Sequence, residues 1–353
     1  MLVHNSVVRD ARVLKEARSL ASHGYSVDVH GFDLKQPFKT ALKLPGSEVN
    51  VYVSTVEPKV ETHEKPIRNK SSFKIIRKLQ KKLSKLFDPN ASHRKQEPAL
   101  SASDAIKEKK FRHYRKVSGA LLKSLESRPD PDIIHIHDII PLTILNELAE
   151  RYPRAIIVWD AHEIYEDVAQ AEPEVGQLNE SIIRSSVEQI EHFITISESF
   201  RDFYGKKYPC LRDRTTVIRN ATELLPLPEY DGRLHEAAGL PRSQRIALYQ
   251  GGFSTHRGLE LLVASGAHLD PSWTIVMMGW GKLEDNLREI AAEVESLAKG
   301  RPLPAVSFIP GAPQEELGLW TSGATLGVIP YEDHGLNHRF CMPNKLWEYP
   351  NAG

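Results

Sequence analysis

Three polar residues near the end of the chain have the types and spacing of a phosphate-binding helix start. Asn344, Lys345 and Glu348 follow Pro343, which suits the first position of a helix because its missing N–H is not needed there. An apolar run at 324–331 predicts a buried strand before them. At such a strand end, helix amides bind anions, lysine neutralises phosphate and glutamate accepts both hydroxyls of a ribose. A capped helix with ordinary surface charges explains the same residues, and both interpretations stay open.

Two apolar runs in the first half end in histidines and carboxylates. The run at 132–142, "DIIHIHDIIPL", predicts a strand that ends in His137 and Asp138. The run at 154–167, "RAIIVWDAHEIYED", predicts a strand followed by Asp160, His162 and Glu163. His135 shares a sheet face with His137 and is expected to be buried and hydrogen-bonded. Imidazole and carboxylate also suit Zn²⁺ or Mn²⁺, but no close pair such as H-x-x-x-H occurs, so no metal site is predicted.

Glycines follow two predicted strands in the second half. The strand "RIALYQGG" runs into Gly251 and Gly252, and the helix after it begins near Arg257. Paired glycines let the backbone approach a phosphate closely, and an arginine there neutralises a diphosphate. Gly279 and Gly281 follow the strand "WTIVMM" and leave room for a nucleotide. A Gly-Gly turn between strand and helix also occurs without a ligand.

Composition and motifs narrow the function class. The 353 residues are 41% hydrophobic and 26% charged, with zero formal net charge, so nothing global indicates nucleic-acid binding. The two cysteines form no disulfide framework or metal cluster and fit a reducing cytoplasm. The loop after the first apolar run, "NSVVRD", lacks glycine. The absence of G-x-G-x-x-G and of a phosphate loop there counts against a dehydrogenase and a phosphate-loop ATPase.

The predicted location is the cytoplasm, with the inner face of the membrane as a second possibility. The N-terminus reaches charged residues too early for a signal peptide, and no apolar run approaches the ~20 residues that span a bilayer. Residues 57–116 are rich in Lys and Arg, and Ser71–Phe87 within them reads as a basic amphipathic helix. Such a helix binds anionic lipid, or it docks its apolar stripe on a sheet; both interpretations stay open.

The elements that must position these residues repeat a strand–helix rhythm twice. A helical pattern from Asp10 stops at Gly24 and leads into the strand "YSVDVHGF", which predicts a parallel sheet. We predict an α/β chain with domains at 1–222 and 244–353. The Pro- and Gly-rich stretch 223–243 is the predicted linker, and the polar stretch "EDHGLNHR" before Cys341 is a predicted loop.

Several stretches together resemble a known family. "PNKLWEY…AG", "RDARVLKEARSLASHGYSV", "DIIHIHD", "WDAHEIYE" and "YQGG…HRGLELL" resemble motifs of family 4 retaining glycosyltransferases, which use nucleotide sugars and have the GT-B fold. The resemblance implies two Rossmann-like domains that face a central cleft. It also implies transfer of a sugar from a nucleotide-diphosphate sugar, with no other cofactor and no metal. The implied acceptor is a saccharide or a lipid-linked sugar, in cell-surface polysaccharide or glycoconjugate synthesis.

The resemblance also implies roles for individual residues. His137 corresponds to a histidine beside the transferred sugar, with Glu163 and Asp10 near it at the cleft. Lys345 and Arg257 would stabilise the diphosphate and Glu348 the ribose. The remaining implied donor-site residues are Gly251, Gly252, Gly279, Gly281, Ile309 and Asn344.

The sequence departs from the family pattern at three places. Phe253 stands where many relatives have arginine, and Phe340 stands where the first of two acidic residues is expected. Relatives continue beyond the equivalent of Gly353, so the second domain is expected to be incomplete. Two alternatives stay open: a non-catalytic or truncated nucleotide-binding paralogue, and a GT-B sugar-nucleotide 2-epimerase.

Overall fold

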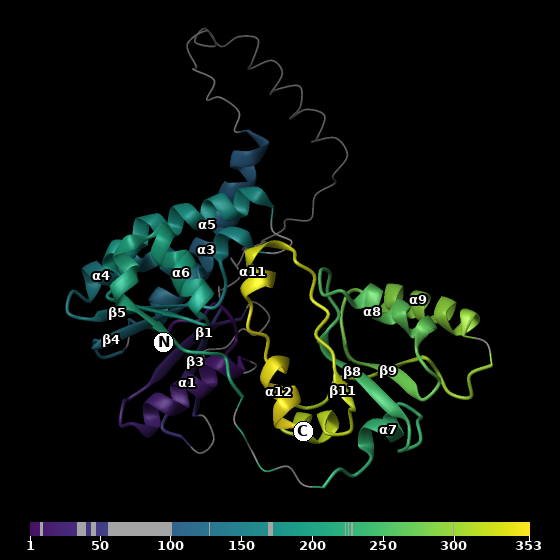
Figure 1. The fold of residues 1–353 in the computed structure, drawn as a ribbon. Coiled ribbons are helices and arrows are strands. Elements are labelled where there is room, and N and C mark those ends of the chain that lie inside the picture. The colour runs from purple at the N-terminus through teal and green to yellow at the C-terminus, as the bar shows by residue number, and fades with distance from the viewer. Residues whose placement is uncertain are drawn as a thin grey trace, which may run out of the picture.

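A computed structural model shows the chain as two α/β lobes (Figure 1). It describes residues 1–7, 10–33, 40–43, 47–55, 101–126, 128–168, 172–222, 224, 226, 229–298 and 300–353. The predicted basic helix Ser71–Phe87 therefore lies outside the described residues, as does most of the predicted insert at 57–116. Among the described residues, no helix combines the length and the apolar character needed to cross a bilayer.

The first lobe is built on a twisted sheet in which the chain's second residue joins two groups of strands. Leu2 forms parallel bridges to His30 on one side and Ile136 on the other. The order is β2-β3-β1, then Leu2, then β4-β5-β6-β7, and only the β2–β3 pair is antiparallel. The strands are β1 (Asp28–Phe32), β2 (Thr40–Lys43), β3 (Asn50–Ser54), β4 (Ile133–His137), β5 (Ile156–Ala161), β6 (His192–Thr195) and β7 (Thr215–Val217).

Helices on both faces of this sheet complete the first lobe (Figure 1). They are α1 (Ala11–Ser22), α3 (Ala102–Ser124), α4 (Leu145–Arg151), α5 (Pro173–Ser186) and α6 (Glu198–Lys207). The helix predicted from Asp10 is confirmed as α1, and Gly24 follows it with a left-handed φ of 90°. Trp159 of β5 is fully buried at the centre, with its ring 4.9 Å from Phe193 and 5.5 Å from Tyr204.

The second lobe has a parallel sheet in the order β10-β9-β8-β11. Its strands are β8 (Arg245–Gly252), β9 (Trp273–Trp280), β10 (Val306–Ile309) and β11 (Leu326–Gly327). Its helices are α7 (Arg233–Ala237), α8 (Leu259–Ser265), α9 (Glu284–Leu297), α10 (Leu317–Thr321), α11 (Gly335–Phe340) and α12 (Lys345–Asn351). Helix α7 falls inside the predicted linker 223–243, and its Leu234 is buried in the core of the second lobe.

The segment before the C-terminus differs from its prediction. The strand expected at 324–331 pairs only at β11, and the expected polar loop contains helix α11. Pro343 precedes α12 by two residues, so it is not the first residue of that helix. Pro350 lies inside α12, which ends one residue later, at Asn351.

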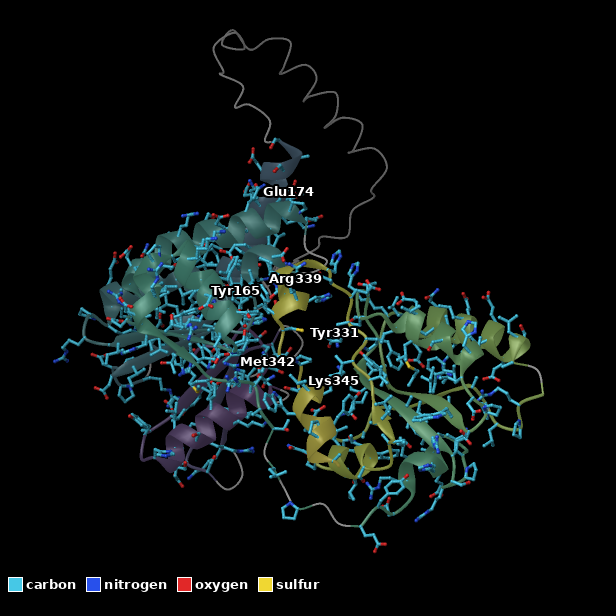
Figure 2. The ribbon with its side chains drawn as sticks, in the orientation of Figure 1. Tyr165, Glu174, Tyr331, Arg339, Met342 and Lys345 are labelled. Carbon is cyan, nitrogen blue, oxygen red and sulfur yellow. The ribbon has the colours of Figure 1, made fainter. Side chains whose placement is uncertain are left out.

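Helix α11 forms because it docks on the first lobe. Asn337 is buried, its carbonyl accepts from Ile164 N at 2.7 Å, and its amide donates to the carbonyls of Ile164 and Asp167 at 2.8 Å. Leu336, Phe340 and Met342 pack against the core of the first lobe. In Figures 1 and 2 the C-terminal segment with Met342, Tyr331 and Lys345 accordingly runs between the two lobes.

Candidate functional site

Three cavities meet where the two lobes face each other. The first, which we call the cleft, has a volume of about 420 Å³ and is lined by both lobes, including Arg12, Glu163, Arg257 and His338. The second, the donor cavity, has about 410 Å³ and lies at the strand ends of the second lobe. The third, the inner cavity, also has about 410 Å³ and lies within the first lobe.

The cavities share walls, so they form one row. Asn220, Arg257, Tyr331 and Pro343 line both the donor cavity and the cleft. His162, Glu163 and Val168 line both the cleft and the inner cavity. A molecule that extends from the donor cavity into the cleft therefore passes Arg257, and one that reaches the cleft from the inner cavity passes Glu163.

The donor cavity brings together most of the residues predicted to bind a nucleotide. Gly251, Arg257, Asn344, Lys345 and Glu348 all line it. Glu348 accepts a hydrogen bond from Gln250 Nε2 at 2.8 Å, so the carboxylate is held at the end of β8. These five positions, predicted from strand and helix ends of the second lobe, lie together at one cavity.

Lys345 is the most unusual charge in this cavity. Its side chain is only 6% exposed, and its Nζ lies 3.4 Å from Tyr331 Oη. Burial first, and then the positive charge of Arg257, lower the pKa of Lys345 to about 8. The Arg257 guanidinium lies 5.2 Å from the centre of the Tyr331 ring. Two cations thus share a partly dry site, which is the arrangement that an anionic ligand stabilises.

The predicted glycines have different roles in the structure. Gly252, Gly279 and Gly281 are not among the lining residues, and neither is Ile309, which is buried. A Cβ on Gly279, whose φ is 157°, would lie 2.0 Å from the carbonyl oxygen of Gly251. A Cβ on Gly281 would lie 2.2 Å from the carbonyl oxygen of Phe253. Close packing between β8 and β9 therefore explains these two glycines without a ligand.

Packing also explains Phe253, one of the departures from the family pattern. Phe253 is 1% exposed, and its ring lies 6.2 Å from those of Tyr249 and Phe308 in the core. Phe253 therefore makes apolar contacts within the core of the second lobe, and it brings no charge to the cleft. Arg257 and Lys345 are therefore the two cations among the residues that line the donor cavity.

His162 and Glu163 stand at the wall between the cleft and the inner cavity. His162 Nε2 lies 3.2 Å from Asp160 Oδ2, and its Nδ1 lies 3.5 Å from Asp138 Oδ1. Burial lowers the pKa of His162, but these two carboxylates outweigh it and the net shift is upward. Desolvation by the cavity walls, and then the charge of Asp138, raise the pKa of Glu163.

His137 lies in the interior of the first lobe, behind that wall. It is fully buried and stacked on His135, with ring centres 4.3 Å apart, and it lines none of the three cavities. Asp160 beside it is also fully buried, and its charge is balanced by Arg12 Nη2 at 2.9 Å. His135 was expected to be hydrogen-bonded; within the described part of the chain its Nε2 has no hydrogen-bond partner. Whether His137 contacts the sugar stays a prediction.

Asp10 is the N-cap residue of α1. It caps α1 by accepting from Val13 N at 3.2 Å, and it also accepts from Asn5 Nδ2 at 2.8 Å. It lines none of the three cavities, whereas Arg12, two residues further along the chain, lines the cleft. Its predicted place beside the reacting sugar remains a prediction.

Comparison with known proteins identifies the family. A model of Glycosyltransferase Family 4 matches residues 11–224, which is more than half of the chain. The chain belongs to Glycosyltransferase Family 4. No curated protein sequence matches it.

Solved structures show the same architecture as this family 4 chain at low sequence identity. Sucrose-phosphate synthase from Thermosynechococcus elongatus is 16% identical, with a TM-score of 0.62 over 95% of this chain and 76% of that one. An α,α-trehalose-phosphate synthase (UDP-forming) from Burkholderia xenovorans, in complex with glucose-6-phosphate, is 12% identical, with a TM-score of 0.62 over 99% and 82%. Anabaena HepE, in complex with UDP and glucose, is 14% identical, with a TM-score of 0.53 over 92% and 72%. The predicted GT-B fold is confirmed.

Several residues that line these cavities were not predicted from the sequence. Tyr331 and Asn220 line both the donor cavity and the cleft, and Trp280 lines the donor cavity with 66% of its surface exposed. The available signal for Trp280 was an aromatic residue between Gly279 and Gly281 at the end of the predicted strand. Gly311, Ala312 and Gln314 of the loop after β10, rather than Ile309, line this cavity.

Proposed function

We propose that the chain transfers a sugar from a nucleotide-diphosphate sugar to a saccharide or lipid-linked acceptor, with retention of the anomeric configuration. The observation that carries the proposal is the row of three cavities with Arg257 at one junction and Glu163 at the other. A nucleotide sugar has a base and ribose, a diphosphate and a sugar in the same linear order. The solved structures of similar fold with UDP and glucose, and with glucose-6-phosphate, support such a donor and a saccharide acceptor.

In this proposal the second lobe holds the donor. The ribose lies against Glu348, and the exposed face of Trp280 is available to the base. The diphosphate lies between Arg257 and Lys345, which stabilise the negative charge that develops as the bond to the sugar breaks. The sugar then extends into the cleft, toward His162 and Glu163.

The acceptor reaches the same point through the inner cavity. The hydroxyls of a saccharide find hydrogen-bonding groups there on His4, Asp138 and Tyr165, whose hydroxyl donates to Asp138 at 2.6 Å. Retention follows when the acceptor attacks from the face that the diphosphate leaves, with the departing phosphate taking the proton. Positioning and charge stabilisation then account for the catalysis. In this scheme the predicted His137 packs against His162, with ring centres 5.7 Å apart, and helps to position it. Asp10 fixes the start of α1.

The proposal is tested by turnover with UDP-, GDP-, ADP- and dTDP-sugars. We expect the sugars of one nucleotide to release the nucleoside diphosphate when glucose, glucose-6-phosphate or a lipid-linked sugar is present. Nuclear magnetic resonance of the product should show the same anomeric configuration as the donor. Tight nucleotide binding without turnover would instead support the non-catalytic paralogue. Interconversion of a UDP-2-acetamido sugar with its 2-epimer in the absence of an acceptor would support the epimerase.

Titration of Lys345 makes a separate prediction for nucleotide binding. A lysine with a pKa of about 8 is charged below pH 8 and neutral above it, so the affinity for UDP should fall as the pH rises from 7 to 9. Losing one charge-assisted contact corresponds to about a tenfold change in the dissociation constant. The charged and titratable groups that face Lys345 are Tyr249, Arg257, Tyr331, Cys341 and Glu348.

Calorimetric titration with UDP at several pH values measures this effect. Lys345→Arg should bind UDP with little pH dependence over the same range, because arginine stays charged. Lys345→Met should bind weakly at pH 7 and show no further loss at pH 9. Equal pH dependence in the parent chain and in Lys345→Met would contradict the assignment.

A further inference from the structure

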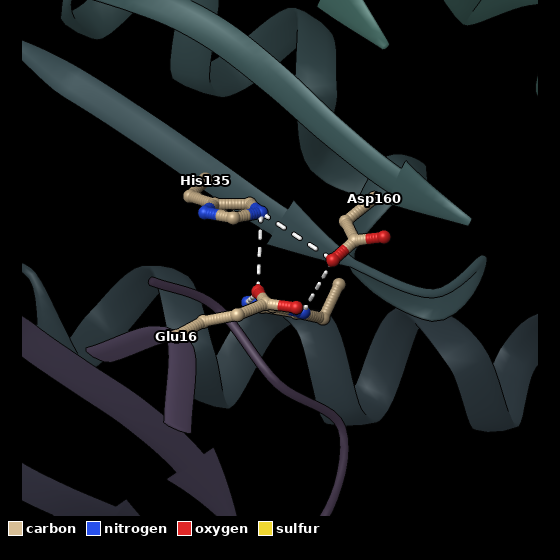
Figure 3. A group of neighbouring side chains, drawn as sticks. Glu16, His135 and Asp160 are labelled. Carbon is tan, nitrogen blue, oxygen red and sulfur yellow. Dashed lines mark ion pairs between the residues drawn. The ribbon is translucent and has the colours of Figure 1, made fainter. Parts of the chain in front are cut away.

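A buried group of four side chains below the cleft has the chemistry of metal ligands. Glu16 comes from α1, His135 and His137 from β4, and Asp160 from β5. One nitrogen or oxygen from each lies within 4.8 Å of all the others. In Figure 3 the side chains of Glu16, His135 and Asp160 point toward one common space from these three elements.

Local structure explains why these four side chains converge. Residues 135 and 137 alternate along β4 and therefore share one sheet face. The parallel register of β4 and β5 places His137 opposite Asp160. Helix α1 crosses this face, with Arg12 and Glu16 one turn apart on the side that faces the strands.

The group leaves its inward-facing atoms without hydrogen-bond partners. Within the described residues, this holds for Glu16 Oε2, His135 Nε2 and both ring nitrogens of His137, all of them buried. His137 is 0% exposed and His135 is 8% exposed, so water does not satisfy them from outside. Buried polar atoms are nearly always paired, and a set of four such atoms that face one another requires an explanation.

The separations within the group suit a shared ion better than direct hydrogen bonds. Glu16 Oε2 lies 4.0 Å from His135 Nε2 and 3.8 Å from His137 Nε2. Asp160 Oδ2 lies 3.8 Å from His135 Nε2. These distances exceed hydrogen-bond length. Ligand atoms around a tetrahedral ion with bonds of about 2.0–2.1 Å lie roughly 3.4 Å apart. To bind one ion, the stacked rings of His135 and His137 must turn so that one nitrogen of each points to the same place.

Arg12 contacts the outer oxygens of both carboxylates most closely. Its Nε donates to Glu16 Oε1 at 2.9 Å, and its Nη2 donates to Asp160 Oδ1 at 2.9 Å and, at a longer 3.2 Å, to Asp160 Oδ2. These contacts orient both carboxylates so that Glu16 Oε2 and Asp160 Oδ2 face the histidines. Outer hydrogen bonds of this kind typically orient metal-binding carboxylates.

We propose that Glu16, His135, His137 and Asp160 bind one Zn²⁺ ion with a structural role. Two imidazoles and two carboxylates suit zinc, whereas magnesium prefers oxygen ligands and several waters. Four protein ligands in a buried position make a closed site, as structural zinc sites are. A close pair such as H-x-x-x-H is not needed here, because the ligands come from three elements rather than from one helix.

The ion fastens α1 to the ends of β4 and β5. Asp160 Oδ2 also lies 3.2 Å from His162 Nε2, so the same carboxylate connects the ion to the histidine at the cleft wall. The ion does not touch the sugar or the diphosphate in the transfer proposed above. The zinc proposal therefore stands or falls independently of the transferase proposal.

The test measures metal binding by the whole chain after treatment with a chelator. We expect calorimetric titration to show one Zn²⁺ bound per chain, with a dissociation constant of roughly 1 µM or tighter, and a melting temperature that rises with zinc but not with magnesium. His135→Asn and Glu16→Gln should each weaken zinc binding by more than the roughly 10- to 100-fold that loss of an outer partner costs. Both variants should also lose the zinc-dependent rise in melting temperature.

Two control variants separate this site from other histidines. His30→Asn removes a buried histidine that already has a partner, Ser124 Oγ at 2.8 Å, and should keep full zinc binding. His334→Asn alters a second histidine group, in which His334 stacks on His256 at 3.6 Å, and should also keep it. The proposal is overturned if the parent chain binds no stoichiometric zinc, or if zinc is lost from His334→Asn and retained by His135→Asn. Where a ligand variant does not fold, absence of stoichiometric zinc from the parent, or loss of zinc from His334→Asn, still overturns the proposal.

Discussion

Arg257→Ala is expected to lower kcat by about 10²–10³-fold, the usual cost of removing one preorganised group that stabilises transition-state charge. Arg257 lines both the donor cavity and the cleft, so it stands where a diphosphate joins the nucleoside to the sugar. Negative charge grows on that diphosphate as the sugar leaves. The loss should therefore fall mainly on kcat, with a smaller weakening of UDP binding.

Steady-state kinetics with the best donor of the panel, together with calorimetric UDP titration, measure both effects. Arg257→Lys should be intermediate, because lysine restores the charge without the fork that contacts two phosphate oxygens. Arg288→Ala is the matched control: Arg288 is on the surface of α9, paired with Glu284, and lines none of the three cavities. Activity in Arg257→Ala equal to that in Arg288→Ala would place the diphosphate elsewhere.

The strand-end positions were predictable because they depend on local patterns. Alternation along a strand puts His135 and His137 on one face, and parallel neighbours bring their carboxyl ends to one sheet edge. The register of β4 against β5, with His137 opposite Asp160, follows from that order. Similarly, Lys345 and Glu348 reach the donor cavity because α12 begins close to the strand ends of the second lobe.

Depth and packing were not predictable in the same way. Whether His137 faces the cleft or lies below it depends on α1, which covers that face and brings Glu16 to it. Gly279 has the spacing of a ligand-binding glycine, but the steric reason for it is the nearby carbonyl of Gly251. Phe253 was missed as a core residue because its position in the family pattern suggests a charge, whereas its ring packs against Tyr249 and Phe308.

Helix α11 shows most clearly why a short segment resists prediction. Three of its six residues are polar and a fourth is Gly335, and locally this composition favours a loop. Its partners, Ile164 and Asp167, are about 170 residues away along the chain. The helix is stable only because docking satisfies these groups, and local sequence patterns contain no information about contacts at that distance.

Asn337→Ala is therefore expected to destabilise the contact between the lobes by about 3 kcal/mol, since three hydrogen bonds of about 1 kcal/mol each are lost. One of them satisfies the backbone N–H of Ile164, which would be left buried without a hydrogen-bond partner.

Because α11 is followed by Cys341, Met342 and Pro343, which line the cleft, its release should also change the shape of the cleft. We expect a lower melting temperature, a larger radius of gyration in X-ray scattering and a lower kcat/KM. Asn337→Asp should destabilise at least as much, because its buried carboxylate would face the carbonyl oxygens of Ile164 and Asp167 that now accept from the amide. Asn146→Ala removes an exposed asparagine whose side chain accepts a hydrogen bond from Gln189, and it should leave all three measurements unchanged. If Asn337→Ala behaves like Asn146→Ala, the docked position of α11 does not hold the lobes together, and the cleft must depend on the contact of Asn220 with Asn344 and that of Thr222 with Asn351.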